Sequence, residues 1–351
     1  MSIDIAKIDK NFAAKNDIGT SNLVFYDIKE NDFCLYGVFY KDGFFRRMPD
    51  EIARATSEGV RILNTHTSGG RLRFMTDSSV VAVSTTMPLG NVNKHSGADM
   101  RVAGFDMYVN GGFAQSFIMP GVTTEAGYDS VRVLPGEGLR EVIIHFPLYF
   151  EVQELRIGLD AGARFLPIPK EKLGKRVLFY GSSITQGGTV SRPGGCFPNI
   201  LAHKLGFDLI NLGFSGNAKG EDVMCDYIAD QNPDIFVLDY DHNAPSLAHL
   251  ESTHERFFLR FRERHPDVPV IMLSAPNLIF DRPCFEPRRE VIRKTYENAL
   301  ARGDKNVRFI DGETLFTTED ADLCTVDRCH PNDLGHYRMA MAIAPVLSEF
   351  L

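Results

Sequence analysis

The chain has 351 residues and a mass of 39.3 kDa, which is enough for two domains of ordinary size. Hydrophobic residues make up 44% and charged residues 24%, a composition typical of a globular protein with a substantial core. The formal net charge of −8 argues against nucleic acid or an anionic membrane as a partner, because both would favour a basic patch.

The beginning of the chain and its cysteines favour a cytoplasmic location. Residues 1–19 contain no apolar core of a signal peptide, and no run of about 18 apolar residues predicts a membrane span. The six cysteines are scattered and form no CxxC pair, as expected in a reducing compartment.

Residues 1–165 are predicted to be rich in β-strands. Short apolar runs lie within residues 71–87, and residues 105–118 have the pattern of a β-hairpin around an Asn-Gly-Gly turn. Many short strands separated by turns predict a β-sandwich or jelly roll. Other strands are expected at residues 131–134, 141–145 and 151–157, and one helical stretch at residues 50–58.

After residue 175 the pattern changes to alternating strands and helices, which is typical of a parallel sheet covered on both faces. We expect a doubly wound three-layer α/β domain over residues 175–351, with five strands in the order 2-1-3-4-5, after a linker at residues 166–174. The strands are expected at residues 176–180, 208–212, 234–240, 268–274 and 307–311, and the helices at residues 197–205, 221–230, 247–264, 287–302 and 334–350.

Ligands of such a sheet bind outside the carboxyl ends of its strands, so the residues after each strand are the candidates for a site. Gly181, Ser182 and Ser183 follow the first strand. A serine placed here would be exposed, with its own N–H directed toward a bound oxyanion. Taken alone, the three residues favour an ordinary turn. Thr185 stands where the GxSxG elbow of α/β-hydrolases has its last glycine, so that elbow is not predicted.

The loops after the next two strands offer donors for an oxyanion. Gly216 follows the second strand and can present its N–H to the same space, although a glycine in this position is common. Asn243 follows the third strand and carries two side-chain N–H groups, which suit an oxyanion. A turn before Pro245 explains this asparagine equally well.

Asp327 and His330 lie three residues apart near the end of the chain. The carboxylate can accept the Nδ1–H of the imidazole, which leaves Nε2 free to take a proton from a serine. A surface loop in which Asn332 or Asp333 caps the last helix is compatible with this interpretation. The alternative of a metal site that adds Cys324 and Cys329 matches no zinc spacing, so neither a metal nor a cofactor is expected.

The four blocks together form a complete set for acyl transfer, since a serine nucleophile needs a positioned base and donors for its oxyanion. In this order they resemble the signature of the SGNH hydrolases, also called GDSL esterases. The resemblance covers about residues 175–351 and implies a catalytic triad of Ser183, His330 and Asp327. It also implies an oxyanion hole made of the Ser183 and Gly216 N–H groups and the Asn243 side chain.

The sequence departs from the family pattern at two positions. Ser182 replaces the usual aspartate of the first block, and Asp241 replaces the usual glycine of the third. Both could shape the substrate pocket, and Asp241 could hydrogen-bond a sugar hydroxyl. The β-rich part is similar in architecture to the sandwich that precedes the SGNH domain in some carbohydrate esterases.

We therefore expect a serine esterase that removes O-acetyl or other short acyl groups, with an acetylated oligosaccharide as its small-molecule substrate. A thioesterase or lysophospholipase with the same triad is the alternative enzyme, although no apolar lid segment is seen. A glycan-binding protein without catalysis is the alternative outside enzymes. Nucleotide binding is disfavoured because neither GxGxxG nor GxxxxGK[ST] follows the first strand. The sequence leaves the oligomeric state open.

Overall fold

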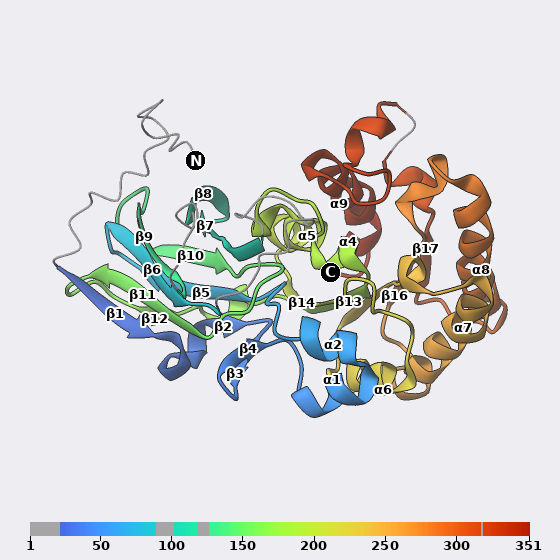
Figure 1. Cartoon of the computed structure of the whole chain (residues 1–351), viewed down its shortest axis with the longest axis horizontal. Helices are drawn as coiled ribbons and strands as arrows, with labels where there is room; N and C mark the ends of the chain where they lie inside the picture. The colour runs from blue at the N-terminus through green and yellow to red at the C-terminus, as the bar shows by residue number, and fades with distance from the viewer. Residues whose placement is uncertain (1–21, 89–101, 118–125, 317–318) are drawn as a thin grey trace.

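The computed structural model describes residues 22–88, 102–117, 126–316 and 319–351 (Figure 1). Residues 1–19, which carried the signal-peptide expectation, and Ile118 of the predicted hairpin lie outside the described residues. Figure 1 shows antiparallel strands on one side of the molecule and a parallel sheet with helices on the other. In the described ranges no helix is both long enough and apolar enough to cross a membrane.

The first part of the chain forms two antiparallel sheets around a shared core. The core takes Leu72 and Phe74 from one sheet and Val83 and Leu155 from the other, all fully buried. This arrangement confirms the β-rich first half, whereas the jelly-roll connection stays a prediction. One sheet has the order β1 (Leu23–Asp27), β11 (Glu154–Asp160), β6 (Val80–Thr86), β9 (Tyr128–Val133). The other has the order β12 (Leu166–Pro167), β5 (Arg71–Thr76), β10 (Arg140–His145), β7 (Phe105–Val109), β8 (Gly112–Phe117), and β2 (Leu35–Tyr36) also pairs with β5.

Local sequence accounts for the hairpin and for one interrupted helix. Asn110 and Gly111 take left-handed φ angles of 48° and 83°, which makes the tight turn between β7 and β8. The helical stretch expected at residues 50–58 is two helices, α1 (Asp50–Thr56) and α2 (Glu58–Leu63). The break occurs because Ser57 is extended and its hydroxyl accepts a hydrogen bond from the Val60 N–H, capping α2. A small sheet of β3 (Phe39–Lys41) and β4 (Phe44–Arg46), not expected, precedes them.

The second part is built on five parallel strands in the order β14-β13-β15-β16-β17, which confirms the predicted order 2-1-3-4-5. Helices α5 and α9 cover one face, and α6, α7 and α8 cover the other. The strands are β13 (Arg176–Gly181), β14 (Asp208–Gly213), β15 (Ile235–Asp239), β16 (Val270–Leu273) and β17 (Val307–Ile310). The helices are α4 (Ser183–Gln186), α5 (Phe197–Leu205), α6 (Asp222–Asp230), α7 (Leu247–Arg264), α8 (Arg282–Ala301) and α9 (Asp333–Ser348).

Helix α8 begins five residues before the predicted start at residue 287. Its first turn contains Pro283, where a missing backbone N–H costs nothing because that N–H has no partner in the helix. The Asp281 side chain accepts a hydrogen bond from the Cys284 N–H and caps the helix. Pro287 therefore lies inside the helix, in its second turn, rather than at its beginning.

Buried polar side chains join the two parts of the chain. Arg47 is only 4% exposed and donates hydrogen bonds to the carbonyl oxygens of Gly213 at 2.5 Å and Leu63 at 2.6 Å. The Ser68 hydroxyl donates to the carbonyl oxygen of Gln186 at 2.7 Å. Since Gly213 ends β14 and Gln186 ends α4, the short helix that follows β13, the antiparallel part braces the edge of the sheet at which the site is predicted.

Candidate active site

The loops that carry the predicted site start side by side. The last residue of β13, Gly181, lies opposite Gly213 of β14 and Asp239 of β15 in the strand register. The segments that contain Ser183, Gly216 and Asn243 therefore leave the sheet at one edge, as expected for parallel neighbours.

Ser183 is the first residue of the one-turn helix α4. The Ser182 hydroxyl accepts a hydrogen bond from the Ile184 N–H at 3.2 Å and caps this helix, while Gly187 ends it with a left-handed φ of 103°. Ser183 itself is half-buried, and its N–H donates no hydrogen bond to any described residue. The short helix therefore holds the serine and leaves its amide available.

The structure brings Ser183, His330 and Asp327 together in one chain of hydrogen bonds. The Ser183 Oγ lies 3.0 Å from the His330 Nε2, and the His330 Nδ1 lies 2.7 Å from the Asp327 Oδ2. The other carboxylate oxygen of Asp327 accepts the backbone N–H groups of His330 at 2.7 Å and Cys329 at 2.9 Å. A carboxylate on Nδ1 selects the tautomer whose Nε2 accepts a proton from the serine.

The hydrogen bonds around Asp327 also favour the ionised form of its carboxyl group. Partial burial acts to raise the pKa of its carboxyl, but the hydrogen bonds from the His330 N–H and imidazole and the Cys329 N–H outweigh burial and lower the pKa below its ordinary value. Asp327 thus remains ionised at neutral pH and keeps the imidazole oriented.

Asn277 holds the loop that carries the aspartate and the histidine. It is fully buried, and its Nδ2 donates to the carbonyl oxygens of Arg328 at 2.7 Å and Cys329 at 2.9 Å. Arg328 takes a left-handed φ of 65°, which is costly for a residue other than glycine and so needs such support. Sequence reasoning missed Asn277, although it follows the fourth strand of the sheet and the same strand-end rule points to it.

The two predicted oxyanion donors lie in the loops beside Ser183. Gly216 has a left-handed φ of 69°, and its N–H makes no hydrogen bond with a described residue. One N–H of the Asn243 side chain donates to the Phe214 carbonyl oxygen at 2.9 Å, which orients the amide and leaves its second N–H for a ligand. Their role as an oxyanion hole stays a prediction.

Ser182 and Asp241, considered above as substrate contacts, are 0% and 1% exposed. The Ser182 hydroxyl caps α4, and the Asp241 Oδ2 accepts the Ala275 N–H at 2.9 Å. Burial raises the pKa of Asp241 to about 6, opposed by hydrogen bonds from the Ala275 and His242 backbone. Because both side chains point into the protein, the structure favours a supporting role for them over contact with a substrate.

Tyr149, from the antiparallel part, reaches Ser183. Its hydroxyl donates to the Ser183 carbonyl oxygen at 3.0 Å. A side chain at Gly188 would meet the His330 ring at 3.1 Å and the Tyr149 hydroxyl at 3.3 Å, so tyrosine and histidine enclose one small space beside the serine. Tyr149 lies between β10 and β11, far from the four blocks, and no local signal in the sequence points to it.

The cysteine, aspartate and histidine side chains considered as metal ligands do not form a metal site in the described residues. In the described part of the chain, no group of three or more His, Cys, Asp or Glu side chains could hold a metal ion. The Cys324 and Cys329 thiols are free, and burial raises the pKa of Cys329 to about 11, which disfavours the thiolate that a metal would need. A serine with a base and an orienting carboxylate is instead equipped for acyl transfer.

Two family models match the chain over most of its length. The GDSL-like lipase/acylhydrolase family matches residues 174–348. The N-terminus of SGNH-hydrolase-type esterases matches residues 23–165. A comparison with curated proteins finds no match.

Solved structures share the arrangement of both parts. A GDSL-like lipase from Bacteroides ovatus is 28% identical, with a TM-score of 0.82 over 94% of this chain and 98% of that one. The salicylyl-acyltransferase SsfX3 of a tetracycline biosynthetic pathway is 23% identical, with a TM-score of 0.73 over 90% and 94%. A family two carbohydrate esterase from Clostridium thermocellum, solved with cellohexaose, is 16% identical, with a TM-score of 0.60 over 80% and 92%. The fold is that of the SGNH hydrolases with an antiparallel N-terminal part.

Proposed function

The chain belongs to the SGNH-type esterases of the GDSL-like lipase/acylhydrolase family, and from this membership we propose that it removes O-acetyl or other short acyl groups from oligosaccharides. Membership of this family supports the hydrolysis of acyl esters. The short length of the acyl group and the choice of a sugar as its carrier are what we propose in addition. The observation that supports ester hydrolysis most directly is the pair of hydrogen bonds that connects the Ser183 Oγ through His330 to Asp327.

The reaction proceeds in two steps on these residues. The His330 Nε2 takes the proton of Ser183 as the serine oxygen attacks the ester carbonyl, and Asp327 stabilises the imidazolium that forms. The Ser183 and Gly216 N–H groups and the second N–H of Asn243 stabilise the oxyanion. His330 returns the proton to the leaving alcohol, and then activates water to hydrolyse the acyl-serine.

The choice of a sugar ester rests on two supports. Several solved structures with the same two-part arrangement are described as carbohydrate esterases, although their identities of 16% and below establish only a shared fold. The second support is Tyr149, because a polar group from the antiparallel part beside Ser183 suits a substrate that both parts contact. We accordingly treat residues 1–165 and 175–351 as two domains, joined by residues 166–174, that act as one unit.

Hydrolysis of 4-nitrophenyl acetate by the wild-type protein and by Ser183→Ala tests the chemistry. We expect the substitution to lower kcat by more than about 10⁴-fold, because it removes the nucleophile. Ser348→Ala, at an exposed serine whose hydroxyl donates to the Ala344 carbonyl oxygen of its own helix, is the matched control and should retain full activity. Equal rates for wild type and Ser183→Ala would leave the non-catalytic glycan-binding alternative.

A second assay tests the substrate class. Acetylated oligosaccharides are compared with long-chain esters and thioesters at matched concentrations, with products identified by mass spectrometry. The proposal predicts the highest kcat/KM for acetylated sugars. A strong preference for long-chain esters or thioesters would instead support the lysophospholipase or thioesterase alternative.

A further inference from the structure

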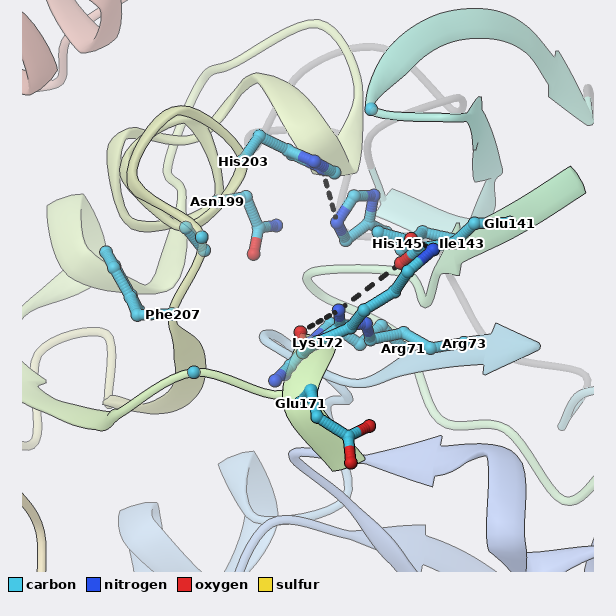
Figure 2. Close-up of a pocket in the computed structure, with 14 residues that line it drawn as sticks. Arg71, Arg73, Glu141, Ile143, His145, Glu171, Lys172, Asn199, His203 and Phe207 are labelled. Carbon is cyan, nitrogen blue, oxygen red and sulfur yellow. Dashed lines mark hydrogen bonds and ion pairs between the residues drawn. The ribbon is translucent and has the colours of Figure 1, made fainter. Parts of the chain in front are cut away.

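A cavity of about 350 Å³, with charged and amide side chains among its lining residues, lies between the two parts of the chain, away from Ser183. Gly174 and Phe207, in its wall, precede β13 and β14, so the cavity adjoins the amino ends of the parallel strands, whereas Ser183 follows a carboxyl end. Figure 2 shows Asn199 and His203 of α5 on one side and Arg71, Arg73 and Glu141 of β5 and β10 on the other. Its size and its place at a junction are those of small-ligand sites.

Asn199 presents an acceptor without a partner. The residue is only 1% exposed, and its Nδ2 donates to the Pro193 carbonyl oxygen at 2.9 Å, which assigns the direction of the amide. The Asn199 Oδ1 is buried and receives no hydrogen bond from a described residue, and Figure 2 shows it directed into the cavity. Leaving such an oxygen unsatisfied costs about 1–3 kcal/mol, so the cavity calls for a ligand that donates a hydrogen bond.

Arg73, on the opposite wall, has a buried donor without a partner in the described residues. It is 8% exposed, and its terminal nitrogen donates to the Lys172 carbonyl oxygen at 3.0 Å and to Glu141 at 3.3 Å. The Arg73 Nε is buried and has no partner among the described residues. A ligand that satisfies both walls must therefore accept a hydrogen bond as well as donate one.

The His203 side of the cavity is rigid. The imidazole of His203 stacks on Tyr108 with ring centroids 3.9 Å apart, and its Nε2 lies 3.1 Å from the Nε2 of His145. His145 in turn bonds through Nδ1 to the buried Asp106 at 2.8 Å. Burial, with the neighbouring His145, moves the pKa of His203 well below its ordinary value, so the His203 imidazole itself is uncharged. A wall already held in place reduces the entropy lost when a ligand binds.

The cations around the cavity already have carboxylate partners, and Glu171, which also lines it, adds a carboxylate that forms no ion pair with a described residue. Arg71 forms an ion pair with Asp208, and Glu141 lies 3.3 Å from Arg73 and 3.7 Å from the ammonium of Lys172. An anion would compete with these carboxylates, and a fully ionised one has no hydrogen to donate to Asn199. Hydroxyl groups both donate and accept, so a neutral polyol meets the two unpaired atoms together.

We propose that this cavity binds a neutral polyhydroxylated ligand of monosaccharide size, at a site separate from Ser183. A hydroxyl of the ligand donates to the Asn199 Oδ1, and a ligand oxygen accepts from the Arg73 Nε. Because these residues belong to different parts of the chain, the bound ligand holds the two parts together and should raise the melting temperature.

Binding is measured by calorimetry and ligand-observed NMR with glucose, xylose and galactose, and the Ser183→Ala protein shows that binding does not need the nucleophile. Inorganic phosphate and glucuronate are the charged comparisons. We expect at least one neutral sugar to bind with a Kd below about 10 mM. Ala202→Leu, which fills the cavity from α5, should weaken it at least tenfold, and so should Asn199→Leu. Ala301→Leu, at an exposed position of α8, is the matched control and should leave the Kd unchanged.

Three results would overturn the proposal: no neutral sugar binding, tighter binding of phosphate or glucuronate, or unchanged binding in Ala202→Leu. The Ala202→Leu variant keeps every polar group of the cavity, so it decides the question even if Asn199→Leu folds poorly. Activity of the wild-type protein on 4-nitrophenyl acetate is measured separately, so failure of this site leaves the proposed esterase function untouched.

Discussion

The hydroxyl of Tyr149 donates a hydrogen bond of 3.0 Å to the carbonyl oxygen of Ser183, and so connects the antiparallel part of the chain to the residue proposed as nucleophile. Tyr149→Phe removes only this hydroxyl. We expect kcat on 4-nitrophenyl acetate to fall about 2- to 10-fold, the amount that one neutral hydrogen bond contributes. Tyr337→Phe, at a tyrosine that is 51% exposed, should change nothing. An unchanged kcat in Tyr149→Phe would show that the contact does not position the serine.

Asp327→Asn tests the orientation of the imidazole. An amide in this position can turn its N–H₂ toward the His330 Nδ1, which favours the tautomer with a proton on Nε2 and leaves that nitrogen unable to accept from Ser183. We expect kcat to fall by about 10³- to 10⁴-fold with little change in the circular dichroism spectrum. The exposed Asp322→Asn is the control. A loss below tenfold would mean that the histidine does not depend on this carboxylate.

Asn243→Ala tests the oxyanion donor. Since the oxyanion exists only in the transition state and the tetrahedral intermediate, we expect kcat to fall by about 10²- to 10³-fold while KM stays within a few-fold. Asn243→Asp keeps the size of the side chain but has no N–H, and should be impaired to a similar extent. A rise in KM with unchanged kcat would assign Asn243 to ground-state binding instead.

Asp241→Asn tests the buried acid behind the site through the pH dependence of stability. Burial raises the pKa of Asp241 to about 6, so the folded protein keeps this proton in a pH range where the unfolded chain, with a carboxyl pKa near 4, has released it. The free energy of unfolding therefore falls as pH rises from about 4 to about 6, by up to about 3 kcal/mol from this group.

The asparagine side chain is neutral at every pH, so the free energy of unfolding of the variant does not fall through this position as pH rises. Relative to wild type, Asp241→Asn should be more favourable at pH 8 than at pH 4.5 by about 1–3 kcal/mol, as measured by urea unfolding. The exposed Asp129→Asn should show no such difference. The same relative stability at both pH values would contradict the raised pKa.

Much of the architecture can be read from local patterns. Continuous apolar runs predict the five parallel strands, and the doubly wound class that they indicate supplies the strand order. Four helices begin and end within two residues of their predicted limits. Polar residues after the strands point to the site, because parallel strands bring their carboxyl ends to one edge. Ser183 lies there by this rule, whereas Asp327 and His330 come from the long loop between β17 and α9, and the spacing of the two residues points to them.

Other features depend on contacts that no local pattern contains. Tyr149 reaches Ser183 from the other part of the chain, and Asn277 holds a loop some fifty residues further on. Ser182 and Asp241 looked available to a substrate, but packing buries both. The sequence by itself determined the strands, their order and the chemistry at their ends, because apolar runs mark the strands and their alternation with helices indicates a doubly wound sheet of known strand order. Only the tertiary structure decided burial, the supports of the triad and the cavity beside α5, because each arises where segments distant in sequence pack together.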